Sequence, residues 1–202
     1  MKVSTLGNAV PKRGNRFSQW IARTLMSWCG WCIEGDIPNL PKFVLIGAPH
    51  TSNWDFVLAM ATLSALNIKV SWMGKHTLFR WPFKGVLKWL GGVPVDRTNR
   101  SGGIVSQTIE VMNKRDQFVI ALMPEGTRTK VHRWKSGFYR IAQGAKVPIV
   151  LVRFDYGRKV IGIGPVIEPS GDITADLAHI QSFFTGIEGK NPHQGVSLQG
   201  DS

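Results

Sequence analysis

The feature that most constrains the fold is an alternation of short apolar runs with longer segments of helical periodicity. Three runs are continuous and of strand length: residues 43–48 (FVLIGA), 117–123 (QFVIALM) and 148–154 (PIVLVRF). Such runs are typical of strands that are buried on both faces, as in parallel sheets covered by helices on both sides. The sequence therefore predicts an α/β fold with a largely parallel sheet flanked by helices.

Weaker segments complete this pattern over one domain. Further strands are predicted at residues 69–73, 92–95 and 159–164, and helices at 53–66, 83–91, 103–114, 136–145 and 173–184. A chain of 202 residues suits one sizeable core, and it shows no internal repeat. We expect a single domain over residues 39–186, after a separate N-terminal segment of residues 1–38. Residues 187–202, rich in Gly, Asn, Gln and Ser, are expected to be a disordered tail.

The charge of the chain points to an anionic partner. Its formal net charge is +12, and the basic residues are not confined to one tail. Between Lys69 and Arg100 the only acid is Asp96, and between Arg128 and Lys159 the only acid is Asp155. Such a surface attracts nucleic acid, an anionic membrane face or phosphorylated substrates.

The N-terminal segment from Phe17 to Ile33 has an amphipathic pattern. Apolar residues recur in it near helical spacing, with arginines around them, and Arg23 interrupts it. It falls short of the ~20 apolar residues of a membrane span, and no secretory signal precedes it. A helix of this composition either lies in a membrane interface or packs on its own domain, and the sequence leaves both interpretations open.

A C-x-x-C motif, Cys29 to Cys32, lies in this segment. A redox pair would need a strand leading into a helix N-terminus, and a zinc site would need about four ligands. Neither context is predicted, so we expect two buried or membrane-facing thiols. Two cysteines in the whole chain fit a reducing compartment.

Residues 48–56 (APHTSNWDF) place His50 directly after the first long apolar run and Asp55 five residues later. In one interpretation Asp55 only caps a helix, because Ser52 to Asp55 fits the capping pattern. In the other, Asp55 holds the imidazole of His50 in the tautomer that a general base needs. A metal site at this pair would lack partner ligands, so no metal is expected.

Other polar groups follow other predicted strands. Arg97 follows a short strand, and residues 123–129 (MPEGTRT) follow another, carrying Glu125 in a tight loop. Gly126 lets the loop backbone approach a ligand, while Thr127 and Arg128 offer donors to an anion. Because working groups collect at the carboxyl ends of such strands, these residues together predict a site that binds a phosphate and deprotonates a neighbouring group.

These residues fall in four ordered blocks that resemble the motifs of the glycerophosphate and lysophosphatidate acyltransferase family. Residues 50–55 match its H-x-x-x-x-D block, 91–97 (GGVPVDR) its G-x-I-F-I-x-R, 123–129 its F-P-E-G-T-R-S and 147–152 (VPIVLV) its V-P-I-I-P-V. Lys75 resembles the family's lysine before the second block, and residues 135–137 its K-x-G. The resemblance spans about residues 40–165, and four blocks in order are more specific than any one.

The resemblance implies an O-acyltransferase. His50 would be the general base on a free hydroxyl of a glycerol-phosphate acceptor, with Asp55 orienting the imidazole. Arg97 and Arg128 would bind the acceptor phosphate, and Glu125 a hydroxyl or an arginine. The acyl donor would be acyl-CoA or acyl carrier protein as a co-substrate, with no cofactor. The acceptor is a lysolipid, so we expect a peripheral enzyme on the cytoplasmic face of an anionic membrane.

Three departures from the motifs leave the acceptor open. Pro49, Pro94 and Leu151 stand where the family usually has Asn, an aromatic residue and Pro. The acceptor is therefore lysophosphatidate or another lysolipid, such as a lyso-ornithine lipid or another lysophospholipid.

Two other classes of protein also fit the charge. A non-catalytic basic protein that binds membrane surfaces would explain the charge and the N-terminal segment, but not the His–Asp pair. A nucleic-acid binder gives no reason for the P-E-G-T-R loop at a strand end, so no nucleic acid is expected as partner.

Overall fold

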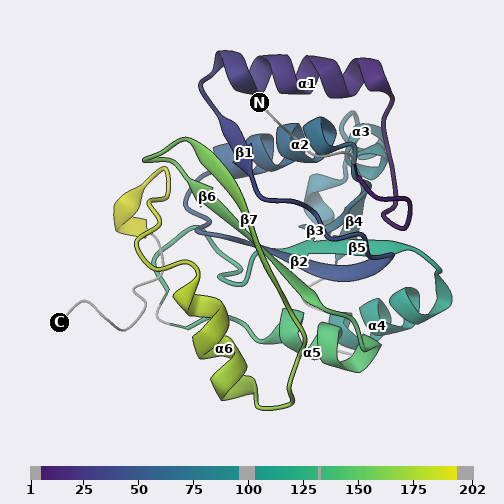
Figure 1. Cartoon of the computed structure of the whole chain (residues 1–202). Coiled ribbons are helices and arrows are strands. Elements are labelled where there is room, and N and C mark those ends of the chain that lie inside the picture. The colour runs from purple at the N-terminus through teal and green to yellow at the C-terminus, as the bar shows by residue number, and fades with distance from the viewer. Residues whose placement is uncertain (1–5, 96–102, 132, 195–202) are drawn as a thin grey trace.

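Helices cover both faces of a seven-stranded sheet in the computed structural model, which describes residues 6–95, 103–131 and 133–194 (Figure 1). The strands are β1 (Cys32–Glu34), β2 (Lys42–Ala48), β3 (Ser71–Lys75), β4 (Gly92–Val95), β5 (Phe118–Leu122), β6 (Ile149–Asp155) and β7 (Val160–Ile167). The α-helices are α1 (Arg16–Trp28), α2 (Trp54–Leu66), α3 (Lys84–Trp89), α4 (Ile104–Lys114), α5 (Gly137–Ala145) and α6 (Ile173–Ser182). Two 3₁₀ turns, η1 (His76–Leu78) and η2 (Pro192–Gln194), complete the described elements.

The sheet is largely parallel, as the sequence predicts. Its strand order is β1-β7-β6-β2-β5-β3-β4, and only β6 and β7 pair in antiparallel fashion. β2 lies in the middle, parallel to both of its neighbours, with Ile46 in register with Leu122 of β5 and Leu151 of β6. The carboxyl ends of β2, β5 and β6 therefore meet at one edge of the sheet.

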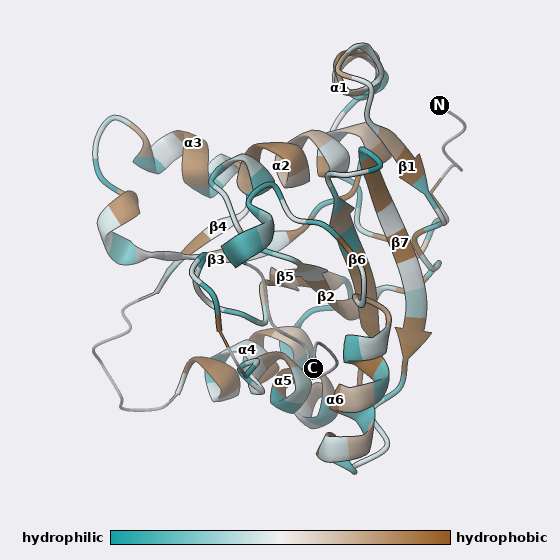
Figure 2. Cartoon of the chain, turned by 90° about the vertical axis from the view of Figure 1, so that its left-hand side faces the viewer, coloured by the Kyte–Doolittle hydropathy of each residue, from teal (hydrophilic) through white to brown (hydrophobic). Residues whose placement is uncertain are grey.

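Side chains of β2 alternate between two separate cores. Phe43 and Leu45 pack with buried residues of α1 and α2, whereas Val44 and Ile46 pack with buried residues of α4, α5 and α6. Figures 1 and 2 show the same division, with α1, α2 and α3 on one side of the sheet and α4, α5 and α6 on the other. Burial on both faces explains why β2 is a continuous apolar run rather than an alternating one.

The N-terminal segment differs from the expectation in one respect. α1 ends at Trp28, and the chain turns at Gly30, whose φ of +80° suits glycine. β1 follows and pairs with β7, so residues 32–34 belong to the sheet, and the domain boundary expected at residue 38 falls inside the folded unit. The C-x-x-C motif thus joins a helix end to a strand, and its two thiols are free, Cys29 exposed and Cys32 half-buried.

α1 has both a packed side and an exposed side. Ala22 and Met26 are buried against the core, and Arg23 Nε donates to the carbonyl of Ala65 in α2 at 2.9 Å. The other side carries exposed large apolar residues, namely Phe17, Trp20, Ile21, Leu25 and Trp28. Among the described residues, no helix has the length and apolar character needed to cross a bilayer.

Candidate active site

His50 lies two residues beyond the carboxyl end of β2, at the edge where three parallel strands end. Its Nδ1 lies 3.1 Å from Oδ2 of Asp55, and its side chain is 19% exposed. An ionised Asp55 can only accept, so the proton of a neutral imidazole sits on Nδ1. Nε2 therefore keeps its lone pair, as a general base requires.

Asp55 is completely buried but has donors on both carboxylate oxygens. Oδ2 accepts from the N–H groups of Thr51 and Ser52, both at 2.8 Å, and Oδ1 accepts from the hydroxyl of Tyr156 at 2.7 Å. Burial alone would raise the pKa of Asp55, but the hydrogen bonds from His50, Tyr156 and Ser52 together hold it below its ordinary value. The carboxylate is therefore ionised at neutral pH.

Both sequence interpretations of Asp55 describe part of its geometry. The hydroxyl of Ser52 accepts from the N–H of Trp54 at 3.2 Å, while Asp55 accepts from the N–H of Ser52. The N-cap of α2 is Asn53, whose side chain makes no capping hydrogen bond, so only the acidic half of the predicted capping pattern, from Ser52 N–H to Asp55, is present. The same carboxylate contacts the imidazole of His50, so the capping interpretation and the catalytic one do not compete.

Tyr156 is a site residue that sequence reasoning missed. It follows Asp155, the last residue of β6, and its ring packs edge-on against Trp31 with centroids 4.9 Å apart. Burial and the contact with Asp55 raise the pKa of its hydroxyl, which keeps the hydroxyl a donor to the carboxylate. A signal was present, because Tyr156 follows a strand end just as His50 does.

The carboxylate of Glu125 binds the backbone of the loop that carries His50. It is buried, and both of its carboxylate oxygens lie 3.1 Å from the backbone N of His50. This contact differs from the hydroxyl or arginine that the resemblance implies for Glu125. Burial raises the pKa of Glu125 to about 7, and the N–H of His50 only partly offsets this effect.

Replacing Glu125 with Gln is expected to remove the part of the pH dependence of the free energy of unfolding that comes from this carboxyl group. The ordinary pKa of 4.5 applies to Glu125 in the unfolded chain and about 7 in the folded one, so the folded chain binds more protons between these values. The free energy of unfolding therefore falls as pH rises through this range, by up to about 3 kcal/mol. Urea unfolding at pH 5 and pH 8 should show a smaller loss in Glu125→Gln than in the parent.

The exposed Glu110 provides the control for this measurement, because its pKa lies below the ordinary value. Glu110→Gln should keep the parent's loss of stability between pH 5 and pH 8. An equal loss in Glu125→Gln would contradict the raised pKa of Glu125.

The remainder of the P-E-G-T-R loop presents cationic groups at the same edge. Gly126 has a φ of +67°, and a Cβ built on it would lie 2.8 Å from Nζ of Lys135, so this lysine packs on the loop. Thr127 Oγ1 lies within the turn, 3.2 Å from Oγ1 of Thr129. The side chain of Arg128 is exposed, and that of Lys135 is exposed as well. Both residues belong to the loop that carries Glu125 or to the segment packed on it.

Residues 187–194, which we name the C-terminal strap, cross this edge of the sheet. Asn191 donates from its backbone N to Thr51 Oγ1 at 3.1 Å and from its amide to the Thr51 carbonyl at 2.8 Å. The carbonyl of Glu188 accepts from the N–H of Tyr156 at 2.9 Å. Residues 187–194 fall in the range expected to be a disordered tail, but in the structure these hydrogen bonds attach them to the site. Residues 195–202 lie outside the described part.

Two predicted site residues are not brought into this geometry. Arg97 lies outside the described residues, and Lys75 ends β3 with a side chain that is also outside the description. Within the described part of the chain, no three His, Cys, Asp or Glu side chains group as metal ligands.

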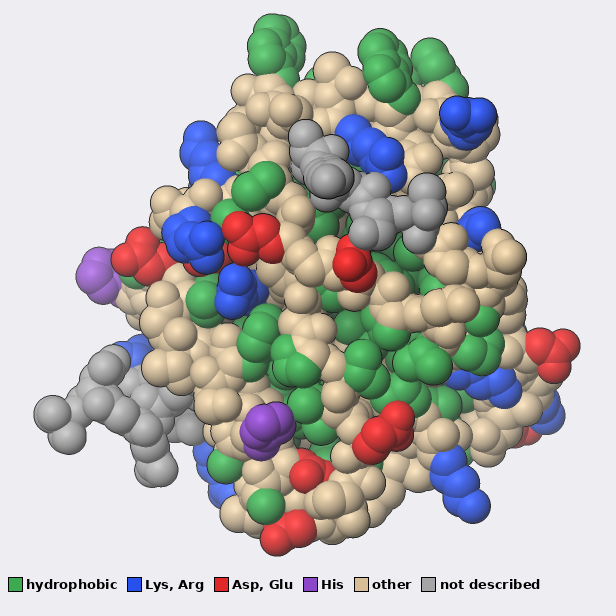
Figure 3. All heavy atoms as spheres, viewed as in Figure 1, with side chains coloured by type: hydrophobic (Ala, Val, Ile, Leu, Met, Phe, Trp, Pro, Cys, Tyr) green, Lys and Arg blue, Asp and Glu red, His purple; other side chains and the backbone are tan. Residues whose placement is uncertain are grey.

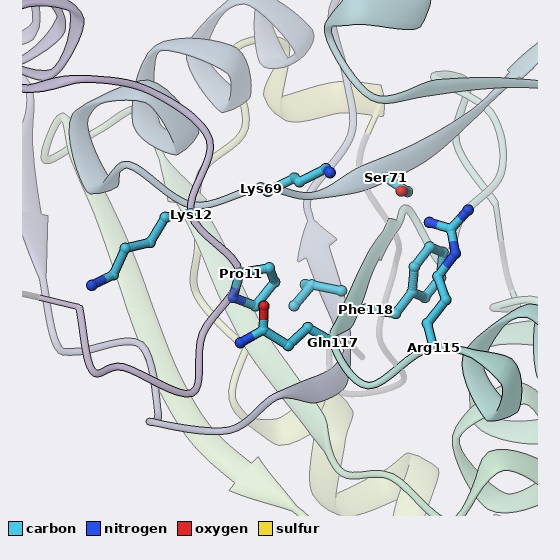
Figure 4. Close-up of a pocket in the computed structure, with 8 residues that line it drawn as sticks. Pro11, Lys12, Lys69, Ser71, Arg115, Gln117 and Phe118 are labelled. Carbon is cyan, nitrogen blue, oxygen red and sulfur yellow. The ribbon is translucent and has the colours of Figure 1, made fainter.

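A separate pocket of ≈ 150 Å³ lies at the opposite edge of the sheet (Figure 4). It is lined by Ser71 and Phe118, the first residues of β3 and β5, and by Lys12, Lys69 and Arg115. Figure 4 shows the side chains of Lys12 and Arg115 pointing away from each other. The pocket is therefore not part of the site around His50.

The chain was also compared with known proteins. A search among curated proteins finds no match to the chain. The family model described as Acyltransferase matches residues 33–155, which is more than half of the chain and runs from β1 to the end of β6. The matched range contains His50, Asp55 and the loop of Glu125. The chain therefore belongs to the Acyltransferase family, the family of 1-acyl-glycerol-3-phosphate acyltransferase type.

Proposed function

We propose that this acyltransferase moves a fatty acyl group from acyl-CoA or acyl carrier protein to the free hydroxyl of a glycerol-phosphate lysolipid such as 1-acyl-glycerol-3-phosphate. The observation that carries the proposal is the contact of His50 Nδ1 with the buried Asp55 at the carboxyl edge of the sheet. That contact lies within the range that matches the family. It supplies an oriented base with an available nitrogen, which transfer to a hydroxyl needs.

In the proposed reaction, Nε2 of His50 takes the proton of the acceptor hydroxyl as its oxygen attacks the thioester carbonyl. The tetrahedral intermediate then collapses, the C–S bond breaks, and the imidazolium returns the proton to the leaving thiolate. The ester and a free thiol are the products, without an acyl-enzyme. Asp55 stabilises the imidazolium, and a positioned base of this kind contributes about 10²–10⁴ in rate.

The acceptor phosphate is proposed to bind on the P-E-G-T-R loop. Arg128 and Lys135 supply charge there, and the positive φ of Gly126 leaves the backbone without a Cβ at the turn. Arg97 joins them by its match to the family motif. Charge-assisted contacts to a phosphate from two or three such groups would select acceptors that carry one.

Arg128→Ala is expected to raise the KM for a phosphate-bearing acceptor about 10- to 100-fold with little change in kcat. The reason is that the lost contact forms in the ground state and the transition state alike. Arg97→Ala should behave in the same way. Initial rates over a range of lysophosphatidate concentrations measure this effect, with Arg140→Ala on α5 as the exposed control. A change only in the KM for the acyl donor would refute this phosphate site.

The enzyme is proposed to work as a peripheral protein on the cytoplasmic face of an anionic membrane. Its acceptor and product are bilayer lipids, so the site has to meet lipid at the surface. Support comes from the net charge of +12 and from the exposed apolar side of α1. Basic residues near an anionic surface contribute about 1 kcal/mol each, and buried apolar groups add to this.

One experiment tests the proposed function directly. Thiol release from acyl-CoA and from acyl carrier protein is followed against a panel of lysolipids, and products are identified by mass. Lysophosphatidate should be acylated. Faster acylation of a lyso-ornithine lipid or another lysophospholipid would replace the acceptor and keep the chemistry. Absence of thiol release with every pair would favour a non-catalytic membrane-surface protein.

A further inference from the structure

The two longest stretches of the chain without an acidic residue lie in its first half, and a third, residues 126–154, lies beyond them. The two longest are residues 1–33 and 56–95, and all 13 Asp and Glu residues lie outside them. Each of these two holds five basic residues: Lys2, Lys12, Arg13, Arg16 and Arg23 in the first, and Lys69, Lys75, Arg80, Lys84 and Lys88 in the second. α1 belongs to the first stretch, and η1 and α3 to the second, so α1 and the segment of η1 and α3 carry basic residues and no acidic ones on one side of the sheet.

The same stretches expose most of the large apolar side chains of the described surface. Trp81 is 92% exposed and Trp89 73% exposed at the two ends of the segment that contains α3, and Trp28 is 88% exposed on α1. Leu78, Phe83 and Val86 are exposed in the same region. Figure 3 shows hydrophobic side chains projecting from the outer side of α1 beyond the rest of the molecule. Soluble proteins rarely expose apolar groups at this density without a partner.

Direct contacts make the two stretches neighbours. The guanidinium of Arg13, just before α1, lies 4.6 Å from the ring centroid of Trp89, and its Nη1 donates to the carbonyl of Leu90 at 3.1 Å. Figure 2 shows α1 and α3 on the same side of the sheet, with α2 between them. Trp54, the exposed first residue of α2, extends the apolar surface to within four residues of His50. The contacts of Arg13 with Trp89 and Leu90 therefore join the two stretches, and Trp54 lies at the start of α2, close to His50 in the chain.

The chemistry of this surface selects its partner. A second copy of the chain would bring one acid-free cationic surface against another, and like charges oppose such an interface. A nucleic acid would stack on indole rings, but it would gain nothing from the exposed aliphatic groups Leu25, Leu78 and Val86. An anionic bilayer matches every component, because indoles suit the headgroup region, aliphatic groups the acyl boundary, and Lys and Arg the lipid phosphates.

We propose that the outer side of α1 and residues 78–89 together form a bilayer-docking surface for anionic phospholipids. Contact at two separated places fixes the orientation of the domain, and Trp54 brings the His50 edge to the lipid side. The proposal deepens the proposed function, on which it rests for a lipid acceptor. The proposal adds residues 78–89 to α1 as a second contact with the bilayer. With α1 as the single contact, the domain could rotate about the axis of that helix.

Vesicle sedimentation with the full chain tests this surface. The probes are vesicles of phosphatidylcholine alone and of phosphatidylcholine with phosphatidylglycerol. The parent should bind the anionic vesicles more tightly, and Trp81→Ser/Trp89→Ser should weaken that binding at least tenfold. Lys84→Glu/Lys88→Glu, which keeps both tryptophans, should weaken binding to anionic vesicles and leave binding to neutral ones unchanged. Val111→Ser/Val166→Ser, exposed apolar positions elsewhere, serves as control and should bind like the parent.

A triple substitution in α1 tests the contribution of this helix to vesicle binding. Trp20→Ser/Leu25→Ser/Trp28→Ser should also weaken binding, and combination with the α3 change should abolish it. Parent binding that persists in Trp81→Ser/Trp89→Ser would overturn the role of residues 78–89. Loss of a dimer or of oligonucleotide binding in that variant, without loss of vesicle binding, would also overturn the proposal.

Activity measurements separate this proposal from the proposed function. Acylation of vesicle-borne acceptor should fall at least fivefold more in Trp81→Ser/Trp89→Ser than acylation of a soluble short-chain acceptor. If the parent acylates soluble acceptor but fails to bind vesicles, the docking surface is wrong and the reaction stands. If the parent binds vesicles through residues 78–89 but releases no thiol, the reaction is wrong and the docking surface stands.

Discussion

His50→Ala is expected to lower kcat by at least about 10²–10⁴ while the chain stays folded. In the proposed reaction the imidazole of His50 takes the proton of the acceptor hydroxyl, and alanine has no group that could do so. Its ring is partly exposed, and its backbone N–H still reaches Glu125 in the variant, so little stability should be lost. Thiol release with acyl-CoA and lysophosphatidate measures kcat, and thermal unfolding verifies the fold.

His179→Ala provides the matched control, because His179 is exposed on α6 and has no place in the site. It should keep the parent's kcat. Unchanged turnover in a folded His50→Ala chain would end the proposed mechanism, whichever lysolipid is used as acceptor.

Asp55→Asn is expected to have the second largest effect. An Asn amide that donates to Nδ1 would force the imidazole proton onto Nε2, and no carboxylate would remain to stabilise the imidazolium. In a serine-protease triad the corresponding change lowers kcat about 10⁴-fold. The variant also leaves fewer acceptors for the buried N–H groups of Thr51 and Ser52, so we expect some loss of stability as well.

Tyr156→Phe separates the effect of the Asp55 charge on the imidazole from the effect of the hydrogen bonds that Asp55 accepts. It removes one hydrogen bond to Asp55 but leaves the carboxylate charge and the contact with His50 in place. We expect kcat to fall less than about tenfold, since one neutral donor is worth about 1 kcal/mol. A loss as large as that of Asp55→Asn would show that the hydroxyl, rather than the charge alone, controls the base.

The elements that bury apolar side chains were predictable from the sequence. The runs that became β2, β5 and β6 are apolar because both faces of the sheet are covered, and their ends shifted by at most one residue. His50 and Asp55 were predictable as a pair because their spacing is local, across one strand end and one helix start. A helix of several turns or a strand buried on two faces leaves a pattern that a reader can recognise.

Three features that depend on tertiary contacts, namely β1, the C-terminal strap and the contact of Glu125 with His50, left no recognisable pattern in the sequence. β1 has three residues, too few to show a period, and the amphipathic segment predicted to end at Ile33 overlapped its first two residues. The C-terminal strap bonds through its backbone and through Asn191, and its polar composition resembles that of a disordered tail. The contact of Glu125 with the N–H of His50 joins residues 75 positions apart, so no spacing in the sequence encodes it.

The pairing of β1 with β7 has a consequence for how the chain assembles. Cys32 pairs with Val160, so β1 leaves the ribosome well before β7 and must wait for it before the sheet can close. Synthesis at roughly 5–20 residues per second keeps β1 waiting for several seconds or more, and such distant pairing slows folding in general. The strap adds a second late contact, at the loop that follows β2. β1 and the strap are therefore both joined to the rest of the domain late in synthesis, and removal of either one should affect the same closing step.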